Sequence, residues 1–251
     1  SPDWAALRKA AEDARLIIQV RGFLSWVGDG RKLTQTGRIG LADGRRLVEL
    51  LDTGDTINPV IGEHVHNTRS SEELGYLNRL TEWAKAAHLV RVASGKLVPV
   101  KKNAALTGKP LELVLALVKA YPDTGAALIP VNQWRQSFVS HAFSSVSNVL
   151  LRALAEAPAA CTLTSLADTA YKALGEWRYL ARLTDQQRDR VRRMTVADVR
   201  TAMAALHVLG VSVLERNSDE VDEHGYADWS KGTAELTDLG RYAIRRVYRM
   251  P

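Results

Sequence analysis

Apolar residues recur every three or four positions along most of the chain, and this spacing predicts a mainly helical protein. Helices are expected over residues 2–26, 41–51, 71–87, 110–121, 132–157, 164–174, 195–209 and 236–249, with an interruption of the fifth near 140–147. Two stretches predict β-hairpins instead, at 89–101 around the turn 93–95 and at 211–236 with a long acidic tip. Short strands are expected at 31–34, at 159–163 and at 105–107.

Capping residues place several of these boundaries. Ser70 or Ser71 with Glu72 or Glu73 is typical of a helix start, in which a hydroxyl and a carboxylate satisfy free amides. Thr195 is expected to cap a helix that Gly210 ends, so 175–194 is interpreted as an insert between two helices. That helix should expose Asp198, Arg200 and Thr201.

A short phrase occurs twice in the chain. Lys32-Leu33-Thr34 leads to Leu41-Ala42-Asp43, and Thr162-Leu163-Thr164 leads to Leu166-Ala167-Asp168. Each copy follows a long amphipathic stretch, and each half of the chain later reaches a predicted hairpin. The repeated order of helix, short strand, helix, helix and hairpin predicts two similar domains, 1–102 and 131–251, joined by a helical segment at 103–130.

Composition limits the possible functions. At 251 residues with 46% hydrophobic residues, the chain can build a packed core in each of two domains. No apolar run approaches the ~18 residues that would cross a bilayer, so we expect neither a membrane anchor nor an export signal. Cys161 is the only cysteine, which excludes an internal disulfide and a cysteine-based metal site and favours a cytoplasmic location.

The net positive charge lies mostly in residues 1–110. The whole chain has a net charge of +6, which suits a protein that meets polyanions. Residues 1–110 hold 17 basic and 12 acidic residues, whereas 111–251 hold 17 and 16. Within the second half, six arginines lie between 178 and 193, and six carboxylates lie between 215 and 228.

The element order, with Leu-Thr at each short strand, resembles the winged-helix superfamily of helix-turn-helix proteins. The sequence Leu236-Thr237-Asp238-Leu239-Gly240 resembles the end of the wing in many bacterial transcription regulators of that kind. The segments Gly28 to Leu50 and Arg69 to Leu74 are similar to actinobacterial proteins of the same kind, a likeness that implies no activity. The resemblance implies two tandem winged-helix domains, with the third helix of each in the major groove and basic wing residues on the DNA backbone.

The residues expected to contact duplex DNA lie in the first hairpin region and in the arginine-rich stretch. They are Arg91, Lys96, Lys101, Lys102, Arg188, Arg192, Arg193 and Arg200. The predicted helix 71–87 is less suited to DNA because its outer face carries Glu72, Glu73 and Glu82 beside Arg79 and Lys85. The acidic tip 215–228 should repel phosphate, and the arginines could equally form a solvated face with Asp185 and Asp189.

Two regions remain open to other interpretations. Arg241, Arg245 and Arg249 stand four apart and so share one face of the last helix. This face is interpreted as an exposed basic ridge, with a phosphate contact or a dimer seam as the alternatives. The tryptophans should mostly be core or interface anchors, whereas Trp177 and Trp229 lie among charges that favour partner contact.

Catalytic motifs are missing from the sequence. Glu63-His64-Val65-His66 is the nearest approach to a metal site, but no further ligands accompany the two histidines. Neither a nucleophile-turn motif nor a complete phosphate-binding glycine motif occurs. We therefore expect a DNA-binding protein without catalysis or cofactor, either a transcription regulator or a chromosome-associated protein. The alternatives are a protein-interaction or assembly module, which could be a homodimer, and a metal hydrolase using His64 and His66.

Overall fold

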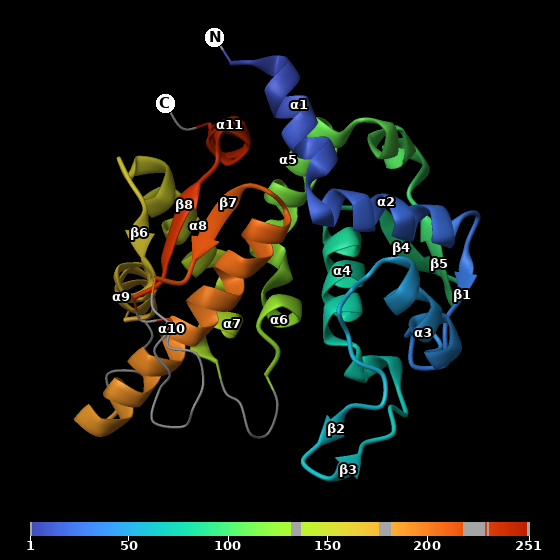
Figure 1. Cartoon of the computed structure of the whole chain (residues 1–251), viewed down its shortest axis with the longest axis horizontal. Helices are drawn as coiled ribbons and strands as arrows, with labels where there is room; N and C mark the ends of the chain where they lie inside the picture. The colour runs from blue at the N-terminus through green and yellow to red at the C-terminus, as the bar shows by residue number, and fades with distance from the viewer. Residues whose placement is uncertain (1, 132–136, 176–181, 218–228, 230, 250–251) are drawn as a thin grey trace. The chain divides into compact units, whose positions relative to one another are not determined.

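The computed structural model (Figure 1) describes residues 2–131, 137–175, 182–217, 229 and 231–249. Helices dominate, and the strands form small antiparallel sheets, as the spacing of apolar residues predicted. The chain forms two compact units, which we call the first unit (11–120) and the second unit (1–10 with 121–251). The segment 103–130 is divided between them, because 103–120 belongs to the first unit and 121–130 to the second.

The N-terminal helical stretch is two helices, α1 (Trp4–Asp13) and α2 (Arg15–Val27), where one was predicted. Ala14 between them is extended, with φ −63° and ψ 123°. Its carbonyl accepts hydrogen bonds from the amides of Ile17 and Ile18, which begin the second helix. No proline or glycine marks this break, so the apolar spacing runs through it unchanged.

The first unit contains a three-stranded antiparallel sheet in the order β1-β5-β4. Its strands are β1 (Arg31–Lys32), β4 (Val90–Ala93) and β5 (Lys96–Pro99). Ser94 and Gly95 both have positive φ angles, 49° and 70°, which is typical of the two-residue turns that match the twist of a hairpin. The predicted hairpin and the predicted short strand are confirmed.

Two helices and a small hairpin lie between β1 and β4. Helix α3 (Leu41–Leu50) is followed by β2 (Val60–Ile61), β3 (His64–Val65), the 3₁₀ helix η1 (Ser71–Glu73) and α4 (Gly75–Ala86). Ser70 and Glu73 form the predicted capping box. No strands were predicted for this hairpin; Asn58 and Thr68 close its base with two reciprocal hydrogen bonds of 2.9 Å.

The strand predicted at 105–107 is wrong. Residues Lys101–Gly108 form the 3₁₀ helix η2, in which the amide of Asn103 bonds to the carbonyl of Val100. The side chain of Asn103 donates to the carbonyl of His88, so the backbone is satisfied locally without a strand partner. Helix α5 (Pro110–Ala120) follows as predicted, and the indole of Trp83 donates to the carbonyl of Leu117 at 2.9 Å.

The second unit repeats the element order of the first. After η3 (Tyr121–Thr124) and α6 (Gly125–Leu128) come α7 (Phe138–His141), α8 (Phe143–Glu156), β6 (Cys161–Thr162), α9 (Leu163–Leu174), α10 (Asp185–Val208), β7 (Ser212–Glu215), β8 (Thr233–Leu236) and α11 (Asp238–Tyr248). Its sheet has the order β6-β8-β7, equivalent to β1-β5-β4. The interruption predicted between 140 and 147 is present at Ala142, where α7 ends and α8 begins.

The repeated sequence phrase makes the same contact in both units. The amide of Leu33 donates to the carbonyl of Gly95 at 2.9 Å, and the amide of Leu163 donates to the carbonyl of Gly232 at 2.8 Å. Each leucine is buried, and each glycine comes directly before the middle strand of its sheet. The sequence repeat therefore corresponds to a repeat in structure.

The insert predicted at 175–194 is corrected by α10, which is one continuous helix of 24 residues. Its cap is Thr184, which forms a capping box with Gln187. Thr195 lies buried inside the helix, where its hydroxyl donates to the carbonyl of Val191. Asp198, expected to be exposed, is 3% exposed and accepts a hydrogen bond of 2.6 Å from Ser137. Asp198 looked like part of a helix start because its buried partner Ser137 is distant in sequence, whereas Thr195 bonds back to its own helix four residues earlier.

Candidate nucleic-acid interface

One face of the β1-β5-β4 sheet carries three cations. Lys32 lies directly opposite Lys96, and Arg91 lies directly opposite Val98, next but one to Lys96 on β5. Residues directly opposite each other, and residues two apart on a strand, share a face of a sheet. Leu97 between them is fully buried, so the other face covers the core, and the three cations are exposed. We call Lys32, Arg91 and Lys96 the basic sheet face.

Lys101 and Lys102 begin η2, directly after the last strand of this sheet, and both are exposed. Within the described parts of the chain, none of these five cations makes an ion pair or a side-chain hydrogen bond. The neighbouring Arg31 differs, because its Nε donates to the carbonyl of Trp26 and its guanidinium lies 5.2 Å from the Trp26 ring centroid. The five unpaired side chains can therefore meet an external anion.

Lys32 was not among the residues predicted to contact DNA. It lies in the repeated phrase, but its place beside Lys96 depends on the pairing of β1 with β5, more than sixty residues away. The only sequence signal was the positive charge inside a predicted short strand.

The outer face of α4 is neutralised by local ion pairs. Nε of Arg38 lies 3.3 Å from Glu72, and Nη1 of Arg38 lies 3.9 Å from Glu82. Lys85 lies 2.8 Å from Glu82. Arg38 offsets the excess of negative charge that the sequence alone gave to this helix, and Lys85 is occupied by Glu82.

Asp55 fixes the start of α4. Its two carboxylate oxygens accept hydrogen bonds of 2.9 Å from the amides of Tyr76 and Leu77, and the hydroxyl of Thr53 donates to it at 3.0 Å. The hydroxyl of Tyr76 donates to Gln19 at 2.6 Å, which ties α4 to α2. Burial raises the pKa of Tyr76 and lowers the pKa of Arg79, whose guanidinium lies 5.5 Å from the Tyr76 ring centroid. Arg79 thus packs on its own helix.

The four predicted arginines of the second unit lie on α10 and differ in their surroundings. Arg188 is paired with Asp185 at 2.6 Å, and this hydrogen bond raises the pKa of Arg188. Arg192 lies 5.0 Å from the Tyr171 ring centroid, and Arg200 lies 5.5 Å from that of Trp229. Arg193 is exposed, and its side chain has no partner in the described residues. The same is true of Arg190, which was not among the residues predicted to contact DNA.

The sheet of the second unit has the opposite charge. Val213 lies opposite Glu235, and Glu215 lies opposite Thr233, which in turn lies opposite Thr162. The alternate residues Leu214, Ala234 and Leu236 point to the core side, so the outward face carries Glu215 and Glu235. This face cannot bind phosphate as the basic sheet face can. The tip at 218–228 and Trp177 lie outside the described residues.

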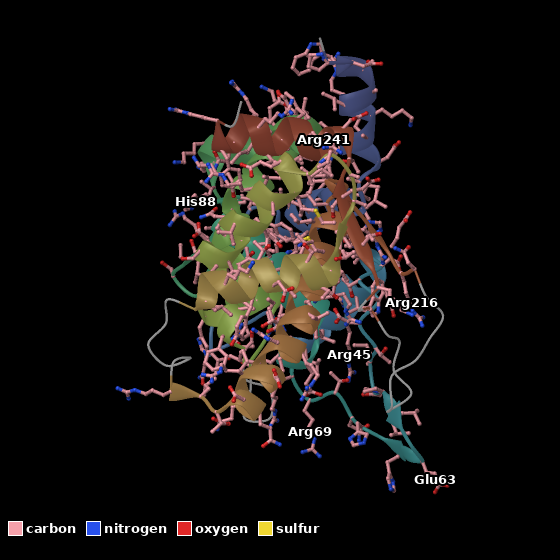
Figure 2. The ribbon with its side chains drawn as sticks, turned by 90° about the vertical axis from the view of Figure 1, so that its left-hand side faces the viewer. Arg45, Glu63, Arg69, His88, Arg216 and Arg241 are labelled. Carbon is pink, nitrogen blue, oxygen red and sulfur yellow. The ribbon has the colours of Figure 1, made fainter. Side chains whose placement is uncertain are left out.

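His64 and His66 lie at the β2-β3 hairpin, where both are exposed. Figure 2 shows Glu63 at the far end of this hairpin. The described residues contain no group of three or more histidine, cysteine or carboxylate side chains that could hold a metal ion. Val60 and Val65 lie directly opposite each other on the hairpin and are 67% and 62% exposed.

In the described part of the chain, no helix combines the length and the apolar character needed to span a bilayer. Comparisons of the chain with protein-family models, with curated protein sequences and with solved structures gave no match.

Proposed function

We propose that the two units are tandem winged-helix domains and that the protein binds duplex DNA without catalysis, as a transcription regulator or a chromosome-associated protein. The repeated element order supports the winged-helix interpretation, as do the equivalent sheet orders and the matched Leu33 and Leu163 contacts. In this fold the hairpin is the wing, and basic wing residues contact the DNA backbone.

The observation that carries the proposal is the set of five exposed, unpaired cations on and directly after the first sheet: Lys32, Arg91, Lys96, Lys101 and Lys102. Cations that have no carboxylate partner are free to displace counterions from phosphates. Five such contacts imply a slope of log K against log salt of about −4.5. Contacts of this type position a protein on DNA and do not read the sequence.

The test is a binding titration of a labelled duplex at several salt concentrations. Arg91→Ala, Lys96→Ala and Lys101→Ala combined should reduce the magnitude of the salt slope by about 3, because each contact contributes about 0.9. The matched control combines Arg21→Ala, Lys109→Ala and Lys119→Ala, which removes the same charge from other exposed positions of the first unit. Equal losses in both variants would refute the basic sheet face as a DNA site, and no wild-type binding at ~50 mM salt would refute the proposed function.

A protein-interaction module is the second candidate, favoured by the exposed pair Val60 and Val65 on the β2-β3 hairpin. Two valines left largely in water can be covered by a second copy of the chain, which would make a homodimer. Sedimentation should then show a dimer that Val60→Ser with Val65→Ser dissociates. A wild-type monomer up to high concentration would exclude the homodimer.

A further inference from the structure

Helix α11 has an outward face of arginines in addition to the surfaces used so far. Arg245, Arg246 and Arg249 are exposed, and Arg241 is half-buried. Arg241 is labelled on this helix in Figure 2. None of the four side chains makes an ion pair or a hydrogen bond with another described residue. The opposite face of the helix is buried through Leu239, Gly240, Ala243 and Ile244.

An aromatic pair borders these arginines. The ring of Trp4 on α1 meets the ring of Tyr242 edge to face, with the centroids 5.4 Å apart and an interplanar angle of 85°. Trp4 is 46% exposed although it is in contact with α11. We call Trp4, Arg241, Tyr242, Arg245, Arg246 and Arg249 the α11 patch.

The folded chain gains little from four like charges here. Arg245 and Arg246 lie in the last turn, where the helix dipole favours a cation by about 0.3–1 kcal/mol. Arg241 lies in the first turn, where the same dipole disfavours it. Arg241 and Arg245 are four residues apart and repel each other. A fixed array of unpaired cations is explained better by an external polyanion than by the stability of the helix.

The packing of α11 decides which polyanion. A helix that lies in a membrane surface needs a free apolar face, whereas the apolar face of α11 is already buried in the second unit. Guanidinium groups form paired hydrogen bonds with phosphate oxygens, and tryptophan and tyrosine are enriched at binding interfaces. The chemistry therefore favours nucleic-acid phosphates.

We propose that the α11 patch is a second DNA-phosphate site, so that each unit contacts duplex DNA through its own surface. This inference deepens the proposed function and rests on it for the identity of the ligand. The first unit uses the basic sheet face, whereas the second unit, whose sheet face is acidic, uses its last helix. The two sites take their charges from different residues and lie in different parts of the chain.

The experiment is a titration of a labelled 20-base-pair duplex with Arg241→Ala and Arg245→Ala combined. Two lost contacts should reduce the magnitude of the salt slope by about 1.8 and weaken binding on the order of 10- to 100-fold at ~50 mM salt. The matched control is Lys172→Ala with Arg182→Ala, which removes from the same unit two exposed charges that have no ion pair among the described residues. Circular dichroism verifies that each variant is folded.

Trp4 provides a second measurement. DNA binding should change the tryptophan fluorescence of the wild-type protein, and Trp4→Phe should remove a distinct part of that change. Wild-type binding by the α11 variant together with weak binding by the Arg91, Lys96 and Lys101 variant would overturn the α11 site and leave the proposed function standing. The reverse pattern would support the α11 site and refute the basic sheet face. Binding to vesicles of phosphatidylserine and phosphatidylcholine without binding to DNA would also overturn the inference.

Discussion

Lys32 and Lys96 lie directly opposite each other on the neighbouring strands β1 and β5. Two like charges directly opposite each other destabilise a sheet by less than about 1 kcal/mol. A phosphate bound between them would convert this repulsion into attraction. The pair thus connects a small loss in the stability of the first unit to the function that we propose for it.

The first prediction separates stability from binding at this pair. Lys32→Glu should raise the free energy of unfolding by about 0.2–1 kcal/mol, because it places opposite charges face to face. The same change should weaken duplex binding more than Lys32→Gln, which removes the repulsion without adding a negative charge. Chemical denaturation and DNA titration of the two variants test this. A Lys32→Glu protein that binds DNA as tightly as wild type would contradict it.

The second prediction concerns α10. Arg193→Ala should weaken binding to unrelated duplexes roughly tenfold at ~50 mM salt, because an exposed and unpaired cation is lost. Arg188→Ala is the matched control on the same helix, since its charge is already compensated by Asp185 at 2.6 Å. Titrations with two duplexes of different sequence provide the measurement. Equal effects of the two substitutions would mean that the α10 arginines form a solvated surface and do not contact DNA.

The third prediction concerns the acidic sheet face of the second unit. Glu215→Gln with Glu235→Gln should leave duplex affinity equal or raise it, because the carboxylates repel phosphate if they act at all. Asp29→Asn, an exposed change in the first unit, serves as the comparison. Weaker binding by the double variant would show that this sheet contacts DNA by hydrogen bonds.

The fourth prediction tests the cap of α4. Asp55→Ala should lower the free energy of unfolding by about 1–2 kcal/mol, because the amides of Tyr76 and Leu77 lose their acceptor. Asp29→Ala removes a carboxylate that is exposed and should change stability by less than about 0.5 kcal/mol. Urea denaturation compares the two, and similar values would mean that water replaces the cap.

The fifth prediction concerns alkaline pH. Burial, with the nearby Asp123, raises the pKa of Tyr248 to about 12, above the usual 10.0. The folded state therefore favours the protonated phenol, so its contribution is complete below pH 10 and is lost as the pH rises from 10 towards 12. Tyr248→Phe should reduce this loss. Part of this loss of stability will remain in the variant, because burial raises the pKa of Tyr121 well above 10 as well.

At neutral pH the two tyrosines should respond with opposite signs. The hydroxyl of Tyr248 is buried without a hydrogen-bond partner among the described residues, so Tyr248→Phe should stabilise the protein by about 1 kcal/mol. The hydroxyl of Tyr121 donates to the carbonyl of Ala202 at 2.9 Å, so Tyr121→Phe should destabilise it by about 1 kcal/mol. Thermal unfolding of both variants gives the comparison, and destabilisation by both would contradict the assignment for Tyr248.

The sequence by itself determined the features that depend on neighbours along the chain. The apolar faces of α3, α4 and α5, the Ser70 and Glu73 capping box, and the turn at Ser94 and Gly95 follow from local spacing and local hydrogen bonds. The repeated Leu33 and Leu163 phrases indicated the internal repeat for the same reason, since each leucine begins the same local succession of elements.

The tertiary structure alone decided the features that depend on partners distant in sequence. Thr195 and Asp198 have the side chains of a helix start, and only their burial inside α10 shows that they do not form one. The pairing of Lys32 with Lys96 needs the register of β1 on β5, and the contact of Trp4 with Tyr242 joins opposite ends of the chain. Such contacts form only when the long segment between the two residues closes into a loop. The spacing of apolar residues within that segment does not indicate which residues will meet.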